Sequence, residues 1–329
     1  MGTLPIMTRS QEHAVSLGPL ARRLREAVLD VIWRQWRAVG AQTIVGKRAD
    51  SVVDPEALIL ISVTLMREEL RLADLVNDWV ALNSDLLSVQ RVNNLSAAYP
   101  ATTREQLSWL AGVAFERGKD SRWRSLVKRS PLVGAAPNSS HSLRTDKKRA
   151  IRPRFAGPAT LMLQLRLGLG VGAKADVLAY LLAMEGGRTT VREIASATSY
   201  TVATVRRAAE DMAAARLIHA SSSQPVTYRA NRDGWTRVLG LTDAPPMWRS
   251  WHDRFLFAVE FLVYAQEVAK LPMSHYAAGV KGRELLEKHR SAFEQDLVTV
   301  WSEHTPVADW MAFVEDAVET LAEWMVENA

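Results

Sequence analysis

The stretch TTVREIASATSYTVATVRRAAEDMAAARLIHA, residues 189–220, decides the expected fold of the middle of this chain. Thr190-Val-Arg-Glu193 is a capping box, in which a hydroxyl and a carboxylate each satisfy a backbone N–H at a helix start. The helix that follows is expected to end near Thr198. Thr201 is expected to cap a longer helix that runs to about Ala215. The sequence therefore predicts two helices joined by a short turn.

A further helix and a hairpin are expected on either side of this stretch. Residues 173–184 have helical apolar spacing and precede Gly186-Gly187, a pair that is typical of a helix end. Two alternating stretches, 217–220 and 226–229, flank the polar loop 221–225, which is the pattern of a β-hairpin. The small side chain of Ala195 would let the two helices cross closely, and the side chains expected to form the core of this unit are Ile194, Val205, Ala208, Met212 and Leu217.

This order of helix, short helix, turn, longer helix and hairpin resembles the winged helix-turn-helix domain of ArsR- and MarR-like bacterial repressors. The resemblance covers the central domain only, residues 158–240. It implies that the second helix of the pair enters the major groove of duplex DNA. The DNA-binding residues that it implies are Arg188, Arg192, Thr201, Ala203, Thr204, Arg206, Arg207, Arg229 and Arg232.

The resemblance also implies a role for each of these side chains. Arg207 would read guanine O6 and N7, and Thr204 would donate to or accept from a base edge. Ala203 would contact a thymine methyl group, while Thr201 and the helix N-terminus suit a phosphate. Arg206 lies beside this face of the helix, and Arg188, Arg192, Arg229 and Arg232 would contact the DNA backbone. Few of these groups can read bases, so modest or partly indirect sequence recognition is expected.

The charge of the chain is concentrated in the same region. The net charge is +5 overall, but residues 128–240 carry 18 basic and 7 acidic side chains, a balance of +11. The balances are +2 for residues 1–127 and −8 for residues 241–329. A basic middle segment favours a polyanionic partner such as DNA. The alternative is that Arg206 and Arg207 pair with acids at i+4 on a solvated helix face.

The regions on either side of the central domain are expected to be helical, so the predicted fold class is mainly α with a small β-wing. In the N-terminal region, 1–129, apolar residues recur every four positions at Leu24, Val28, Ile32 and Trp36. Residues 130–157 read as a flexible basic linker, or as an arm that meets phosphate or a minor groove.

The C-terminal region, 241–329, is acidic and contains tryptophans at helical spacing. Trp248, Trp251, Trp310 and Trp324 are expected to lie in a core. The alternatives are an oligomer interface, where tryptophan is favoured, and an aromatic pocket for an effector. The region is therefore predicted to serve dimerisation or sensing.

Several kinds of chemistry are excluded or not indicated. The chain has no cysteine, which excludes disulfides, thiolate metal sites and cysteine nucleophiles. It has no apolar run of about 20 residues, so no membrane association is expected, and a cytoplasmic location is predicted. No catalytic motif was found. Gly168, Gly170 and Gly172 depart from the dinucleotide-binding spacing and fit a turn between two helices.

The sequence thus predicts a DNA-binding transcriptional regulator, repressor-like and homodimeric, which binds double-stranded DNA and responds to an unidentified small-molecule or protein effector. No enzyme activity, cofactor or metal is predicted. One alternative is a helical scaffold or interaction protein that uses the winged helix as a protein-binding module. The other is an antitoxin-like or defence-associated repressor. Burial of the second helix of the pair against the flanking helices would favour the scaffold.

Overall fold

The computed structural model describes residues 16–41, 47–127, 155, 157–184, 187–241, 245–271, 273–294, 297 and 309–329. These residues form fourteen α-helices and one small antiparallel sheet, so the fold is mainly α, as predicted. The N-terminal helices are α1 (Gly18–Ala38), α2 (Pro55–Leu65), α3 (Leu70–Asn83), α4 (Val89–Ser96), α5 (Ala101–Glu116) and α6 (Arg124–Val127). The C-terminal helices are α12 (Trp251–Lys270), α13 (His275–Lys288) and α14 (Trp310–Asn328).

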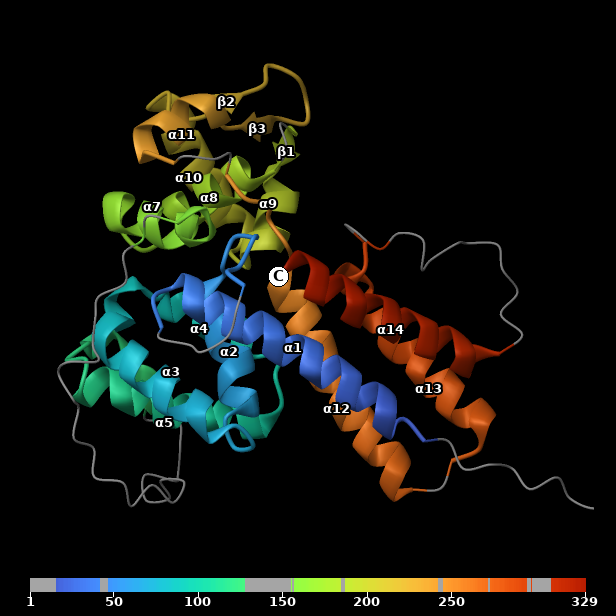
Figure 1. Cartoon of the computed structure of the whole chain (residues 1–329). Helices are drawn as coiled ribbons and strands as arrows, with labels where there is room; N and C mark the ends of the chain where they lie inside the picture. The colour runs from blue at the N-terminus through green and yellow to red at the C-terminus, as the bar shows by residue number, and fades with distance from the viewer. Residues whose placement is uncertain are drawn as a thin grey trace, which may run out of the picture.

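In the sequence, a smaller unit lies between these two groups of helices. This α7–α11 unit occupies the upper part of Figure 1. Its strand order is β1-β3-β2, and both neighbouring pairs are antiparallel. Its helices are α7 (Leu161–Leu169), α8 (Ala173–Ala183), α9 (Val191–Thr198), α10 (Val202–Ala214) and α11 (Arg232–Leu239). Its strands are β1 (Thr189–Thr190), β2 (His219–Ala220) and β3 (Thr227–Arg229).

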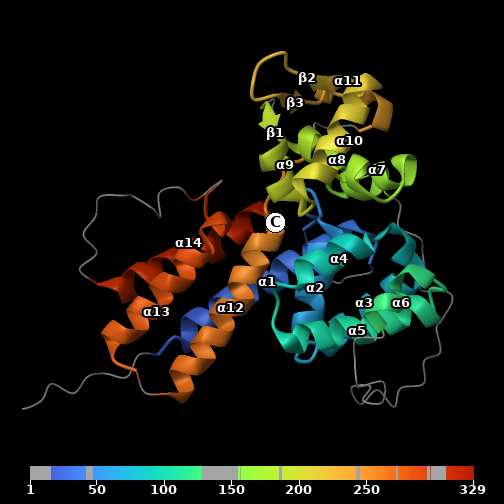
Figure 2. The ribbon, with the colours of Figure 1, turned by 180° about the vertical axis from the view of Figure 1, so that it is seen from behind.

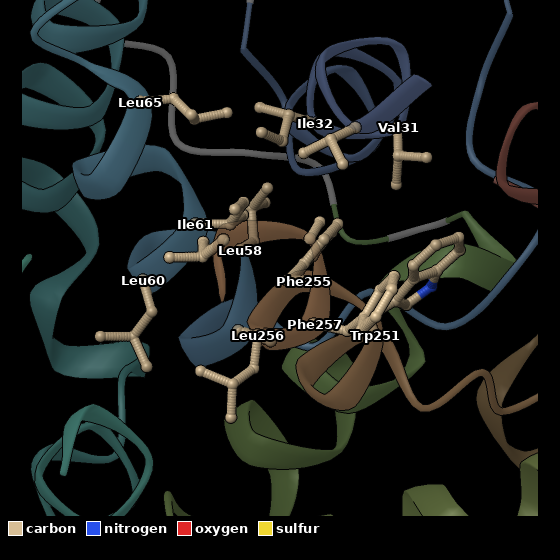
Figure 3. Close-up of a cluster of buried hydrophobic side chains, with 14 of the residues drawn as sticks. Val31, Ile32, Leu58, Leu60, Ile61, Leu65, Trp251, Phe255, Leu256 and Phe257 are labelled. Atoms are coloured by element: carbon tan, nitrogen blue, oxygen red, sulfur yellow. The ribbon is translucent and has the colours of Figure 1, made fainter. Parts of the chain in front are cut away.

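The N-terminal and C-terminal helices form a single helical body around one hydrophobic core. Helix α1 lies between α2–α5 and α12–α14, as both views show (Figures 1 and 2). Figure 3 shows side chains of α1, α2 and α12 converging, among them Ile32, Leu58 and Phe255. The sequence predicted separate regions at 1–129 and 241–329. Periodicity identifies the apolar face of a helix but does not say which distant helix will cover it.

One extended segment, residues 50–53, connects three parts of the fold. The Asp50 amide donates to the carbonyl of Ala329 at 2.8 Å, at the end of the helical body. The Val52 amide donates to Met247 at 3.1 Å, and the Val53 amide donates to Ala159 at 2.9 Å, just before α7. These bonds fix the α7–α11 unit to the junction of the N-terminal and C-terminal helices.

The α7–α11 unit has its own hydrophobic core, which includes most of the side chains that the sequence predicted for it. Ile194, Val205, Ala208 and Met212 are buried as expected, and Ala195 is buried as well. The exception is Leu217, which lies two residues before β2. Leu217 is only half-buried, and its neighbour Ile218 is buried in its place. The expected turn between two helices is confirmed at Gly170 and Gly172, because α7 ends at Leu169 and α8 begins at Ala173, whereas Gly168 belongs to α7.

The tryptophans of the C-terminal region belong to the core, as predicted, or border it. Trp248 and Trp251 are buried, and the Trp251 indole N–H donates to Ser51 at 2.9 Å. Trp324 is half-buried under the guanidinium of Arg254, which lies 4.0 Å from the ring centroid. Trp251 therefore links α12 to the N-terminal part of the chain, whereas Trp324 packs within the C-terminal helices and Trp248 belongs to the core of the α7–α11 unit. Among the described residues, every helix is too short or too polar to cross a bilayer.

A half-buried histidine near the start of α12 makes the stability depend on pH. Burial is the main factor that lowers the pKa of His252 to about 4, and its Nδ1 has no partner among the described residues. In the unfolded chain this group has a pKa of about 6.5. Between these values the unfolded state binds more protons, so stability is lost as the pH falls from about 6.5 to 4. We expect His252→Asn to lose less stability than wild type between pH 7 and pH 5 in denaturant titrations.

Exposed Gln90, which has no titratable group, provides the control, because Gln90→Asn should retain the pH dependence of the wild-type protein. Equal losses for wild type and His252→Asn would contradict the assignment.

Candidate nucleic-acid interface

The capping box predicted at the start of α9 is present. The Glu193 amide donates to Thr190 Oγ1 at 3.3 Å, and the Thr190 amide donates to Glu193 Oε2 at 2.7 Å. Helix α9 then ends at Thr198, where Ser199 adopts a left-handed conformation with φ of 57°. This turn redirects the chain into α10.

Removing the capping hydroxyl should destabilise the unit without touching its exposed basic side chains. We expect Thr190→Ala to lower the free energy of unfolding by about 1 kcal/mol, because an orphan amide of α9 loses its partner. Denaturant titration measures the loss. Thr190→Ser keeps the hydroxyl and is the matched control. A loss as large for serine as for alanine would mean that packing of the methyl group matters more than the cap.

Helix α10 begins at a second cap. Thr201 Oγ1 accepts from the Thr204 amide at 3.2 Å and lies 2.9 Å from the Thr204 hydroxyl. Thr201 and Ala203 are exposed, whereas Thr204 is half-buried. The hydroxyl of Thr204, for which a base contact was predicted, is therefore engaged in the cap. Together with the exposed Val202, the start of α10 presents a mostly apolar surface.

Arg206 and Arg207 lie exposed on the next turn of α10. Neither makes a salt bridge within the described part of the chain. Asp211, a candidate partner for Arg207, instead pairs with Lys174 of α8 at 2.8 Å. The alternative interpretation, in which these two arginines are used in i+4 pairs, is therefore not realised among the described residues.

A second basic row crosses the small sheet. Thr189 is opposite Tyr228, and His219 is opposite Arg229. This antiparallel register places Arg188, which precedes β1, beside Arg229 and in line with His219. All three are exposed, whereas Thr189 and Tyr228 are buried, so the row faces outward. Sequence analysis selected the two arginines but missed His219, because only the register reveals that it joins them.

Two other predicted residues have different surroundings. Arg192 is exposed on α9. Arg232 is half-buried, and its guanidinium donates to the carbonyl of Pro245 at 2.8 Å and approaches that of Met184 at 3.4 Å. Arg232 thus links α11 to the chain that leads into α12, and the phosphate contact predicted for it stays a prediction. The predicted basic arm, 130–157, lies outside the described residues except for Phe155 and Gly157.

A buried cluster of ionisable side chains lies beneath the turn between α9 and α10. Its arginines are Arg91 of α4 and Arg166 of α7, both fully buried. Arg166 forms a two-pronged pair with Asp176 at 2.7 and 2.8 Å and also donates to Glu56 at 2.6 and 2.9 Å. The members of this ionic cluster are Asp54, Glu56, Arg91, Arg166, Asp176 and Tyr200.

Neighbouring charges in the ionic cluster shift the pKa values of several of its members. Burial alone would raise the pKa of Asp54, but the charge and hydrogen bonds of Arg91 outweigh burial and hold this pKa below its usual value. Burial likewise opposes the charge on Arg166, and Asp176 and Glu56 overcome it, so the pKa of Arg166 is raised. Burial and the Asp176 carboxylate raise the pKa of Tyr200, which keeps its hydroxyl as a donor.

This cluster was not predicted from the sequence. Asp54 also caps α2, since it accepts from two amides of the first turn of that helix. The others carried a weak signal. Arg166 and Asp176 are each the single charge in a mostly apolar helical run, LMLQLRL and ADVLAYLL. Isolated charges of this kind are rarely buried unless they are paired.

Comparison of the chain with protein-family models, with curated proteins and with solved structures found no match. The described residues also contain no group of three side chains able to hold a metal ion. The exposed basic surface of the α7–α11 unit is therefore the candidate site, and its geometry alone guides the functional proposal.

Proposed function

We propose that the α7–α11 unit is a winged helix-turn-helix that binds duplex DNA, and that the chain is a transcriptional regulator. The observation that carries this proposal is the exposed surface of α10, where Thr201, Ala203, Arg206 and Arg207 are all accessible. A helix of this kind fits the major groove, and its first residues approach base edges.

The sheet supports the same proposal. The outward row of Arg188, Arg229 and His219 gives phosphate contacts beside the groove, as a wing would. The scaffold alternative expects α10 to be covered by the flanking helices, and the exposure of its basic side chains argues against it. A homodimer would match a twofold operator, and sedimentation of the protein with and without duplex would measure the stoichiometry.

The exposed surface of α10 is expected to discriminate only modestly between DNA sequences. Ala203 and Val202 can contact thymine methyl groups, and Arg207 can bind guanine O6 and N7. Because the Thr204 hydroxyl is engaged in the cap, few polar groups remain to read bases.

Selection of bound duplexes from a random pool, with electrophoretic-shift confirmation, tests this proposal. We expect enrichment of a short motif that contains guanine and thymine, and genome-wide mapping of the bound DNA should recover the same motif. Selection of no duplex at low salt would reject DNA binding. Selection of duplexes without a shared motif would leave DNA binding in place but reject sequence-specific regulation.

A further inference from the structure

The turn that leads into α10 is held by the helical body as well as by the α7–α11 unit. Arg91 of α4 donates from Nε to the carbonyl of Thr198 at 2.7 Å. Asn94, one turn further along α4, donates to the carbonyl of Ser199 at 3.2 Å. Two consecutive carbonyls of the turn thus accept from one helix of the body, although the two segments are more than 100 residues apart in sequence.

A third contact fixes the last residue before the cap of α10. The Tyr200 hydroxyl donates to Asp176 at 2.9 Å and lies 3.4 Å from the hydroxyl of Ser88, which caps α4. Asp176 is itself paired with Arg166, so Tyr200 is attached to the ionic cluster. Thr201, the N-cap of α10, follows immediately.

The backbone of the turn requires such support. Ser199 has a left-handed φ of 57°, a conformation that costs a non-glycine residue free energy and persists where the surroundings hold it. The side-chain amide of Asn94 donates to the carbonyl of Ser199. The contacts from α4 therefore act on the turn that determines the direction of α10.

We infer that Arg91, Asn94 and Tyr200 are positioning residues, through which the helical body fixes the first turn of α10. The exposed side chains of α10 then have a defined orientation relative to the body, and a change in α4 would be transmitted to them. The effect on DNA affinity rests on the proposed function, whereas the hold on the turn is measurable without DNA.

The test uses the double variant Asn94→Ala/Tyr200→Phe in the full chain. It removes two donors but leaves the buried arginines and the basic surface in place. Loss of two hydrogen bonds should increase hydrogen exchange at the Thr204 to Arg206 amides about tenfold. Exchange in the second half of α10 should not change. The matched control, Gln90→Ala/Tyr276→Phe, changes an exposed residue of α4 and an exposed tyrosine of α13.

Duplex affinity gives the second readout. The double variant should bind its preferred duplex about tenfold more weakly, with the salt dependence of wild type, because every phosphate-binding cation remains. Unchanged exchange at the start of α10 would overturn the inference whatever the DNA result. Faster exchange with unchanged affinity would also overturn it. If the double variant exchanges faster but the wild-type protein binds no duplex, the result would support the contacts of the helical body with the turn. The same result would reject the proposed function.

Discussion

The double variant Arg206→Ala/Arg207→Ala should bind duplex DNA about 100-fold more weakly than wild type, since an arginine contact to a base or phosphate contributes about 1–3 kcal/mol. Both side chains are exposed and make no salt bridge within the described residues, so their loss should leave the fold intact. Fluorescence anisotropy with a labelled duplex measures the affinity, and denaturant titration checks the stability.

The matched control is Arg22→Ala/Arg71→Ala, which removes the same charge from exposed positions on α1 and α3. If affinity depends on α10, this control should bind nearly as well as wild type. If it depends only on net charge, both double variants should lose affinity alike. Wild-type affinity in Arg206→Ala/Arg207→Ala would remove α10 from the interface.

The largest expected effect on stability comes from the ionic cluster. We expect Arg166→Met to lower the free energy of unfolding by about 3–5 kcal/mol, the range for breaking a buried ion pair. The substitution leaves the carboxylates of Glu56 and Asp176 buried without the guanidinium that bridges them, and the carbonyl of Leu86 loses a donor at 2.9 Å. Guanidinium titrations of the full chain measure the change.

A second variant separates lost charge pairing from lost packing. Arg166→Met/Asp176→Leu removes one stranded carboxylate and should recover part of the stability, because a buried pair replaced by apolar residues is often tolerated. Arg71→Met, at an exposed position, should change the stability by less than about 0.5 kcal/mol. A double variant less stable than Arg166→Met would show that Asp176 stabilises the fold independently of Arg166.

Local features of this fold were predictable from the sequence. Caps and periodicity depend on neighbouring residues, so the starts of α9 and α10 and the stripe from Leu24 to Trp36 were found correctly. Nothing in the local sequence marks the break between α2 and α3, because Glu68 and Glu69 fit a helix as well as a turn. The choice of Leu217 over Ile218 failed because alternation in a two-residue strand does not fix which face is buried.

Features that depend on distant contacts were not predictable. The apolar stripe of α1 gave no sign that it would pack against both α2 and α12. The sequence also could not show that Arg91 and Arg166, separated by α5 and the basic linker, meet around Glu56. In the candidate site, Arg206 and Arg207 are exposed, and the DNA contacts predicted for them stay predictions. The link from Arg232 to the carbonyl of Pro245 was not predictable, since only the fold brings that carbonyl within its reach.

Duplex affinity of the wild-type protein as a function of salt tests DNA binding most directly. A dimer that makes about 6–10 phosphate contacts should give a plot of log association constant against log salt with a slope of about −5 to −9. Its affinity should then fall by about 10³–10⁵ between 50 and 200 mM salt. A slope near zero, or no duplex binding at 50 mM salt, would contradict a role for the basic surface of α10 and the sheet in DNA binding.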